Sequence, residues 1–490
     1  MAEPAGVGEG DNHRTVELIP VKSDVKLQVI LLTLGALLGW VLSYATDRYQ
    51  RHASRPVRVP VFIQGQDRQG GQFALGVSRA MEYARRYRLD EVEGRRIEPW
   101  LIDENRSTDA IRRLLSEEDP PVIVGPLQST PALRLIPELA GTEPKGLGIP
   151  MILGIPTNAN VTTIDQSATL WRLSPTDIKQ GEIVAKLFQT IARRGHNALL
   201  VMHTGENKEY VDGLRSIVLD QIGKLPAGLP ALPEVTMSSI GETASIQDIF
   251  ARSPPETIIY LGMTAGAVKI LELAKNAGVN AAWIFTDSCI TDPRLLLSKI
   301  DGMPGQFFIT FQAPPASLSK GLQQYISYTN STGGNVLFAS TSGPNDSDPN
   351  SRCDESLAAP SYEIFGFDSY LSALLVIRDA DKADRANVRK RMTQKRSVSH
   401  PLLIADSYKF DDSGNSIETT FYVYRMLKNC TRYVTFEELG ATDYPATPQG
   451  GTSRRTPASA RPRPVTPNEP PSTGTASPAP VVTPASATQT

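Results

Sequence analysis

VIVGPLQST (residues 122–130) and IPMILGIPTN (residues 149–158) are two short apolar runs, and each of them breaks into small polar residues. A third segment, LWRLSPTDIKQG (residues 170–181), comes after them. Apolar runs this short, bounded by Gly and Pro, suit strands that are buried on both faces of a parallel sheet. Hydroxyl and backbone N–H groups would then collect at the carboxyl ends of the strands, where open α/β sheets bind ligands. The stretch 122–181 therefore predicts a ligand-binding rim.

From residue 57 onwards the chain alternates between strand-like and helix-like segments. VRVPVFI (57–63) reads as a strand, and GQFALGVSRAMEYARRY (71–87) reads as a helix with apolar residues at helical spacing. After Pro175 the series starts again, and its strand-like segments are ALLVMH, EVTMSSI, TIIYLG and AAWIFTD. The rules of connection fold such a βαβ series into a right-handed parallel sheet covered by helices. Two series in one chain predict an α/β protein with two lobes.

The composition excludes several classes of function. The 490 residues include 50 Lys+Arg and 52 Asp+Glu, and a formal net charge of −2 gives no electrostatic case for binding nucleic acid. The sequence contains no GxxxxGK(S/T) phosphate loop, no GxSxG nucleophile turn and no HExxH zinc motif. Its five histidines are scattered along the chain. We therefore expect no enzyme activity, no cofactor and no metal.

The three cysteines, Cys289, Cys353 and Cys430, lie far apart and match no metal-binding spacing. Their positions leave two alternatives open, namely a Cys353–Cys430 disulfide or isolated buried thiols.

Both ends of the chain differ from its middle. Residues 1–26 are polar without an apolar period, and residues 440–490 are mostly Pro, Ala, Thr and Ser, so both are predicted to be disordered tails. LQVILLTLGALLGWVLSYAT (27–46) has no charged residue. At ~1.5 Å per residue it would span a bilayer core of about 30 Å, which predicts a transmembrane helix. A signal peptide is the alternative, but no Ala-x-Ala cleavage site follows.

Short motifs along the chain follow one another in the order and spacing of a known family. They are GVSRAMEYA, VIVGPLQS, IPMILGIPTN, LWRLSPTDIKQG, KEYVDG, YEIFGFDSYLSALL and FDDSGN. On these motifs residues 57–427 resemble the type I periplasmic binding proteins, specifically their branched-chain amino-acid (leucine-binding) branch. The resemblance implies two doubly wound parallel-sheet lobes joined by three crossovers, with a ligand cleft between them. Lobe 1 would take 57–174 and 313–408, and lobe 2 would take 175–312 and 409–436.

The resemblance also assigns ligand contacts to four positions. Ser129 and Thr157 match the family residues that hold the carboxylate of an amino acid, and Asp287 matches the acid that meets its ammonium group. Tyr210 matches an aromatic residue of the cleft. The residues alone leave simpler alternatives: capping of helices or turns for Ser129 and Thr157, an N-cap for Asp287, and packing for Tyr210. The aromatic residue that the family has after TIIYLG is missing, which leaves the ligand's identity open.

Two functions follow as expectations. The first is a membrane-anchored solute-binding protein that captures an amino acid or a similar small polar ligand for ABC-type transport or sensing. Its partner would be an ABC permease or a membrane sensor. The alternative is a regulatory interaction protein of the membrane or cell wall, such as a partner of a synthase, with the same fold.

The expected orientation in the membrane rests on two opposing signals. The resemblance implies that the binding domain lies outside the cytoplasm. The basic residues on the two sides of the apolar run are Arg48, Arg51, Arg55 and Arg58 against Arg14, Lys22 and Lys26. By the positive-inside rule this difference of one charge favours a cytoplasmic C-terminal side. We give the resemblance more weight and expect an extracytoplasmic binding domain.

Overall fold

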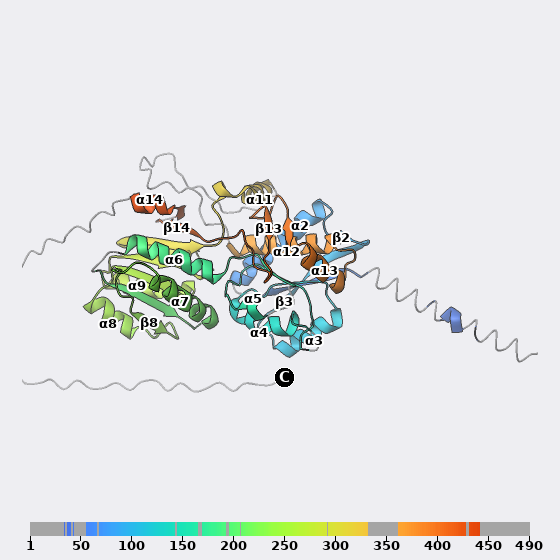
Figure 1. Cartoon of the computed structure of the whole chain (residues 1–490), viewed down its shortest axis with the longest axis horizontal. Helices are drawn as coiled ribbons and strands as arrows, with labels where there is room; N and C mark the ends of the chain where they lie inside the picture. Colours follow the sequence, from blue (N-terminus) through green and yellow to red (C-terminus); the bar gives the residue numbers. More distant parts are fainter. Residues whose placement is uncertain are drawn as a thin grey trace, which may run out of the picture. The chain divides into compact units, whose positions relative to one another are not determined.

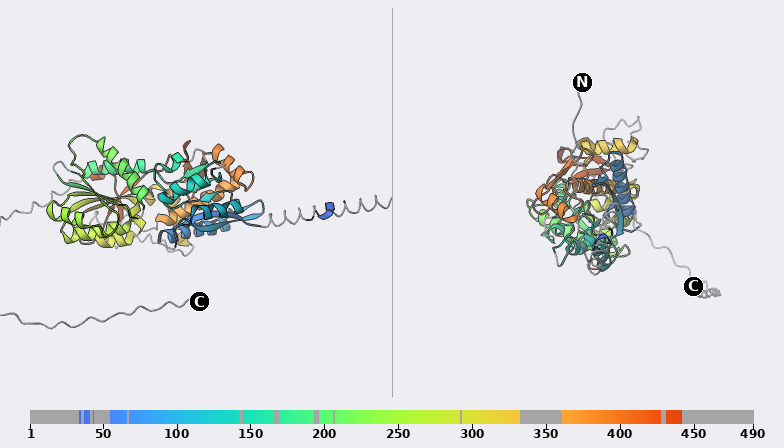
Figure 2. Two further views of the ribbon diagram at one scale, coloured as in Figure 1. Left: turned by 90° about the horizontal axis from the view of Figure 1, so that it is seen from below. Right: turned by 90° about the vertical axis from the view of Figure 1, so that its right-hand side faces the viewer.

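In this computed structural model the described residues are 34, 37–40, 43, 55–65, 68–142, 145–164, 169–192, 196–205, 207–291, 293–331, 361–427 and 431–441. The described residues group into one compact unit. Its elements are drawn in Figure 1 and, from two further sides, in Figure 2.

Several sequence predictions lie outside the described residues. They concern the tails at 1–26 and from 442 onwards, most of the predicted transmembrane helix at 27–46, and the residues Cys353 and Cys430. Among the residues that are described, no helix has both the length and the apolar character needed to cross a membrane. The last helix, α14 (Phe436–Ala441), includes Gly440 and Ala441, so the predicted tail at 440–490 starts too early.

The first sheet has six strands within the described part of the chain. In spatial order they are β2 (Glu91–Val92), β3 (Arg95–Asp103), β1 (Val57–Ile63), β4 (Ile123–Val124), β5 (Met151–Leu153) and β6 (Leu170–Arg172). All neighbours are parallel except β2 and β3. Every residue of β4, β5 and β6 is buried, as expected for short apolar strands covered on both faces. The parallel strands predicted from the stretch 122–181 are confirmed.

Helices cover both faces of this sheet. Successive residues of β1 point to opposite faces, and the side chains on each face pack against a different helix. Val59 and Val61 pack in one buried cluster with Phe73 of α2 (Arg68–Arg86), whereas Phe62 packs in another with Leu135 of α4 (Ser129–Leu139). The other helices that Figure 1 shows around this sheet are α3 (Thr108–Glu118), α5 (Val161–Ile164), α12 (Ser361–Asp379) and α13 (Arg385–Gln394). We name the sheet and these helices lobe 1.

The second sheet has seven strands among the described residues. In spatial order they are β15 (Thr431–Tyr433), β14 (Tyr422–Met426), β11 (Gly305–Phe311), β10 (Ala281–Phe285), β9 (Thr257–Leu261), β7 (Ala198–His203) and β8 (Glu234–Met237). Its helices are α6 (Asp177–Ile191), α7 (Lys208–Gly223), α8 (Ala244–Arg252), α9 (Thr264–Asn276), α10 (Pro293–Ile300) and α14. This sheet with its helices is named lobe 2 (Figure 1).

The described chain passes between the two lobes in three segments, at residues 173–176, 312–319 and 410–421. After the second of them, α11 (Lys320–Ser331) and α12 return to lobe 1, where α12 packs lengthwise on α2. Two short strands, β12 (Ser397–Ser399) and β13 (Ser407–Lys409), pair with each other in a small antiparallel sheet.

The segment SYKFDDSGNSIETTFYVYRML (407–427) reads in sequence as a hairpin that turns at residues 412–415. The structure shows that this prediction is wrong in its strand pairing. A tight turn does form there, because Phe410 bridges Ser416 and the Asn415 carbonyl accepts from the Asp411 N–H at 3.0 Å. The following strand β14 does not pair with β13, however; it joins β11 and β15 in the second sheet. Local turn residues predicted the turn, whereas the partner of β14 depends on the tertiary fold.

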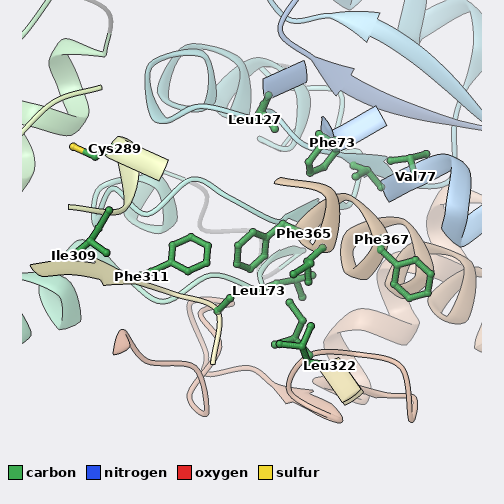
Figure 3. Packing of buried hydrophobic residues seen from close by; sticks show 14 of the residues in the cluster. Phe73, Val77, Leu127, Leu173, Cys289, Ile309, Phe311, Leu322, Phe365 and Phe367 are labelled. Atoms are coloured by element: carbon green, nitrogen blue, oxygen red, sulfur yellow. The ribbon is translucent and has the colours of Figure 1, made fainter. Parts of the chain in front are cut away.

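Apolar side chains join the two lobes between β11 and α12. The rings of Phe311 and Phe365 meet edge to face with centroids 6.3 Å apart. Figure 3 shows these two rings facing each other, with Leu173 of the first connecting segment beside them. All three residues are buried, so the junction contributes hydrophobic stabilisation as well as backbone connections.

Candidate functional site

Asp287, which follows β10 and opens a short 3-10 helix (Asp287–Thr291), is held by two hydrogen-bond donors from lobe 2. The Tyr210 hydroxyl donates to Asp287 Oδ1 at 2.7 Å, and Gln180 Nε2 donates to the same oxygen at 2.9 Å. Gln180 Nε2 also donates to Thr310 Oγ1 at 3.0 Å. Tyr210 and Asp287 therefore have polar roles beyond packing and capping, and the predicted pair is in direct contact.

Asp177, the first residue of α6, is a second carboxyl group beside Asp287. It is fully buried. Burial raises the pKa of Asp177 to about 7, with the charge of Asp287 adding to the rise and the nearby Thr157 and Arg172 opposing it. Its backbone N–H donates to the Thr157 carbonyl at 2.7 Å. Asp177 thus links a lobe 1 position to the acidic residue of lobe 2.

The environment of Asp287 favours binding of a positively charged ligand group. Loss of surrounding water is the largest cause of the raised pKa of Asp287, and the donors Tyr210 and Gln180 partly oppose it. The residue remains partly exposed, unlike Asp177. Burial, together with the charges of Asp287 and Asp177, raises the pKa of the Tyr210 phenol well above its usual value, so Tyr210 stays a donor at neutral pH.

Arg172, the last residue of β6, is a buried cation that interacts electrostatically with Asp177. It is 0% exposed, and its guanidinium donates to the Asn158 carbonyl at 2.6 Å, to Asn415 Oδ1 at 3.0 Å and to Thr162 Oγ1 at 3.3 Å. Burial lowers the pKa of Arg172 to about 10, which leaves it charged at neutral pH. The guanidinium therefore ties the loop after β5 to the turn in the third connecting segment.

The face of lobe 1 that carries Ser129 contacts the first turn of α7. Thr130 Oγ1 donates to Asn207 Oδ1 at 3.0 Å and also to the carboxylate of Glu209. Asn158 Nδ2 donates to the Glu209 carbonyl at 2.8 Å. Glu209 directly precedes Tyr210, which donates to Asp287. These contacts therefore place lobe 1 next to the residues that hold Asp287.

The four predicted site residues fall into two groups. Tyr210 and Asp287 are hydrogen-bonded, and Thr157 reaches them through Asp177. Ser129 is the first residue of α4 and is buried, but among the described residues no hydrogen bond joins it to the other three. The cap position of α4 is Gln128, so the alternative that Ser129 is a helix cap is wrong.

Sequence reasoning missed Asp177, Gln180 and Thr310 as members of the site. A signal for the first two was present, since residues three apart on a helix share a face and both follow the turn at Pro175. Thr310 lies inside the apolar strand β11, where no sequence pattern marks it as a site residue. Within the described ranges, no cluster of His, Cys, Asp and Glu could hold a metal, and Cys289 is a buried free thiol.

Replacing Asp177 by Asn is expected to flatten the pH dependence of stability. In the unfolded chain an Asp pKa is about 3.9, so the folded protein, where the pKa of Asp177 is about 7, binds the extra proton between these values. This contribution to stability is complete below about pH 4 and is lost as the pH rises to about 7, amounting to about 4 kcal/mol. Urea unfolding of wild type and Asp177→Asn across this range measures it.

Asp368, whose pKa burial also raises to about 7, adds the same slope to both proteins and cancels in the comparison. Asp248→Asn, at an exposed position on α8, serves as the control. Parallel curves for wild type and Asp177→Asn would contradict the assignment of this titration to Asp177.

No protein-family model and no curated protein sequence matches this chain. Solved structures do resemble it. The leucine-binding protein LivK of Thermotoga maritima superposes with a TM-score of 0.59 at 18% sequence identity, over 77% of this chain and 98% of that one. An ABC transporter substrate-binding protein of Desulfitobacterium hafniense, in complex with Leu, gives a TM-score of 0.56 at 15% identity, over 78% of this chain and 100% of that one.

A solute-binding protein of R. palustris in complex with benzoate is a third similar structure. Its TM-score is 0.57 at 13% identity, over 77% of this chain and 95% of that one. At such identities the likeness shows the fold alone. One part of the predicted fold class is confirmed. This chain is mixed α/β with mostly parallel sheets, and its fold matches that of the type I periplasmic binding proteins.

Proposed function

We propose that this protein binds an α-amino acid or a similar small polar solute between its two lobes and performs no covalent chemistry. The observation that carries the proposal is the acidic pair of Asp177 and Asp287, which lies beside residues that follow strands of both sheets. Thr157 follows β5 of lobe 1, and Asp287 follows β10 of lobe 2. Open α/β sheets bind ligands at these ends. The structural relatives, which include proteins in complex with Leu and with benzoate, support a small solute.

The two ends of an amino acid would meet different parts of the site. The ammonium group would lie against the partly exposed carboxylate of Asp287, which Tyr210 and Gln180 hold in place. The carboxylate would lie near Thr157 and near Ser129. Ser129 is in the first turn of α4, where the Gln128 side chain makes no capping hydrogen bond. The positive end of the helix dipole favours an anion there. A ligand that contacts both lobes stabilises the arrangement in which they lie together.

A thermal-shift screen tests this function. We expect at least one member of a panel of α-amino acids, their amides and small carboxylates to raise the melting temperature of the full-length chain. Ligand at a hundred times its Kd adds about 2.7 kcal/mol, which corresponds to a shift of about 3 °C for a chain of this size. The shift should disappear in Asp287→Asn and persist in Asp301→Asn, an exposed position of the same lobe. No shift with any solute would contradict solute binding and favour the regulatory alternative.

The cellular setting is part of the same proposal. The uncharged run at 27–46 would anchor the protein in a membrane with its binding domain outside the cytoplasm. An ABC permease or a membrane sensor would then receive the loaded protein. Reporter fusions at both ends test the orientation, and activity of a cytoplasmic reporter at the C-terminal end would contradict it.

A further inference from the structure

A small set of residues joins the two lobes directly beside the proposed site. The set, which we name the latch, consists of Thr130 and Asn158 of lobe 1 and Asn207, Glu209 and Gly213 of lobe 2. Three latch residues are direct sequence neighbours of the proposed ligand contacts Ser129, Thr157 and Tyr210. The latch therefore fixes how far apart these contacts of the two lobes lie.

The Asn158 side chain is held in place from within its own lobe. Asn158 is 2% exposed, and its Oδ1 accepts from the Asn160 N–H at 2.9 Å. Its carbonyl accepts from the Arg172 guanidinium at 2.6 Å. The remaining group, Nδ2, donates across to the Glu209 carbonyl at 2.8 Å. Because lobe 1 already fixes this side chain, the contact with lobe 2 costs little conformational freedom.

Gly213 of α7 allows lobe 2 to approach this amide. A β-carbon at Gly213 would lie 2.8 Å from Asn158 Nδ2, which is closer than β-carbons lie to other atoms. A larger residue at this position would therefore push the amide away from the Glu209 carbonyl. Gly is disfavoured relative to Ala inside a helix, so Gly213 favours the contact between the lobes at the expense of α7.

The Thr130 hydroxyl makes the other contact of the latch. It donates to Asn207 Oδ1 at 3.0 Å and also to the Glu209 carboxylate. A hydrogen bond to a charged acceptor is about twice as strong as one between neutral groups. Atoms of the chain itself make all of these bonds, so they favour this arrangement of the lobes with or without a solute.

We propose that the latch holds the two lobes together by itself, and that Asn158 and Gly213 are the positioning residues of this closure. The lobes are joined by connecting segments, which permit hinge motion. One hydrogen bond between chain atoms shifts such an equilibrium by about fivefold. A solute that contacts both lobes then binds an arrangement that is already populated, which raises its apparent affinity. The proposal goes beyond the proposed function, because closure by the latch needs no solute.

A distance between spin labels on the two lobes tests the latch with no solute added. Glu117→Cys on α3 and Asp220→Cys on α7 place the labels at exposed positions of lobe 1 and lobe 2. Cys353 and Cys430 are replaced by Ser, and Cys289 is buried and does not take a label. Double electron–electron resonance on the full-length chain should give one narrow distance distribution while the latch is intact.

Two variants open the latch from opposite lobes. Asn158→Asp keeps the acceptor for Asn160 and removes the donor to Glu209, whereas Gly213→Ala displaces the same amide from the side of lobe 2. Each should increase the population outside the original distance peak by about fivefold. Gly223→Ala is the matched control, because it lies in the same helix with nothing within 4 Å of its β-carbon. It should leave the distribution unchanged.

An unchanged distribution in both Asn158→Asp and Gly213→Ala would overturn the latch. A shift of equal size in Gly223→Ala would overturn it too, and so would a distribution as broad with the latch intact as in the variants. Circular dichroism checks that each variant folds, and either latch variant alone decides the outcome. Because no solute is present, the latch can fail while the thermal-shift screen succeeds, and the reverse also holds.

Discussion

Gly76→Ala is expected to destabilise the protein by about 3 kcal/mol, because overpacking a closely packed contact costs about 1–3 kcal/mol and more where backbone atoms collide. A β-carbon at Gly76 would lie 1.8 Å from the carbonyl oxygen of Glu363, on the facing helix α12. Gly366 repeats the arrangement from the other side, since its β-carbon would lie 2.2 Å from the Phe73 carbonyl oxygen. The two glycines let α2 and α12 approach until their backbones touch.

The sign of this effect separates packing from helix propensity. Ala is favoured over Gly inside a helix by up to about 1 kcal/mol, so without the collision the substitution would stabilise. Gly71→Ala is the matched control, because it lies in the same helix with nothing within 4 Å of its β-carbon. Urea unfolding should show Gly71→Ala slightly more stable than wild type. Equal effects of the two substitutions would contradict the close helix pair.

Arg172→Met is expected to cost about 3–5 kcal/mol, since it removes one charge of a buried set and leaves the others without compensation. The substitution keeps much of the side chain's volume but deletes the donors to Asn158, Thr162 and Asn415. It also removes the positive charge that opposes the raised pKa of Asp177. The loop after β5 and the turn at residues 410–416 then lose their shared anchor.

A double-variant cycle identifies the cause of this loss. If the cost arises partly from the uncompensated carboxyl of Asp177, then Arg172→Met combined with Asp177→Asn should be more stable than the sum of the single effects predicts. Arg252→Met is the control, because its exposed pair with Asp248 should contribute only about 0–1 kcal/mol. Strict additivity, or a loss for Arg172→Met as small as that control, would contradict the buried network.

The sequence predicted the parallel strands because burial on both faces leaves a continuous apolar run. The strands β7 (ALLVMH) and β9 (TIIYL) are buried at every residue. The continuous apolar run is the feature of their sequences that predicts a strand. The pairing of β14 with β11 could not be predicted in the same way. These strands are far apart in the sequence, and the turn at Gly414 suggested a nearer partner than the one observed.

Two residues of the site were predictable because their side chains follow the ends of strands. Asp287 and Thr157 were identified because polar residues directly follow apolar runs and match a family motif. Asp177 and Gln180 lie on a helix that reads as amphipathic, where a buried carboxyl group looks like a surface residue. Their role depends on contacts with Thr157 and Asp287, which only the tertiary structure brings near.

Calorimetric titration of the full-length chain with an α-amino acid from the screen, and with the N-acetyl form of the same amino acid, tests solute binding most directly. Acetylation removes the ammonium charge that Asp287 is proposed to meet and leaves the carboxylate and side chain unchanged. We predict one amino acid bound per chain, and binding at least about a hundredfold weaker for the N-acetyl form, because breaking a buried charge pair costs about 2–5 kcal/mol. Equal affinity for the two forms, or no heat of binding with any α-amino acid, would contradict the proposal.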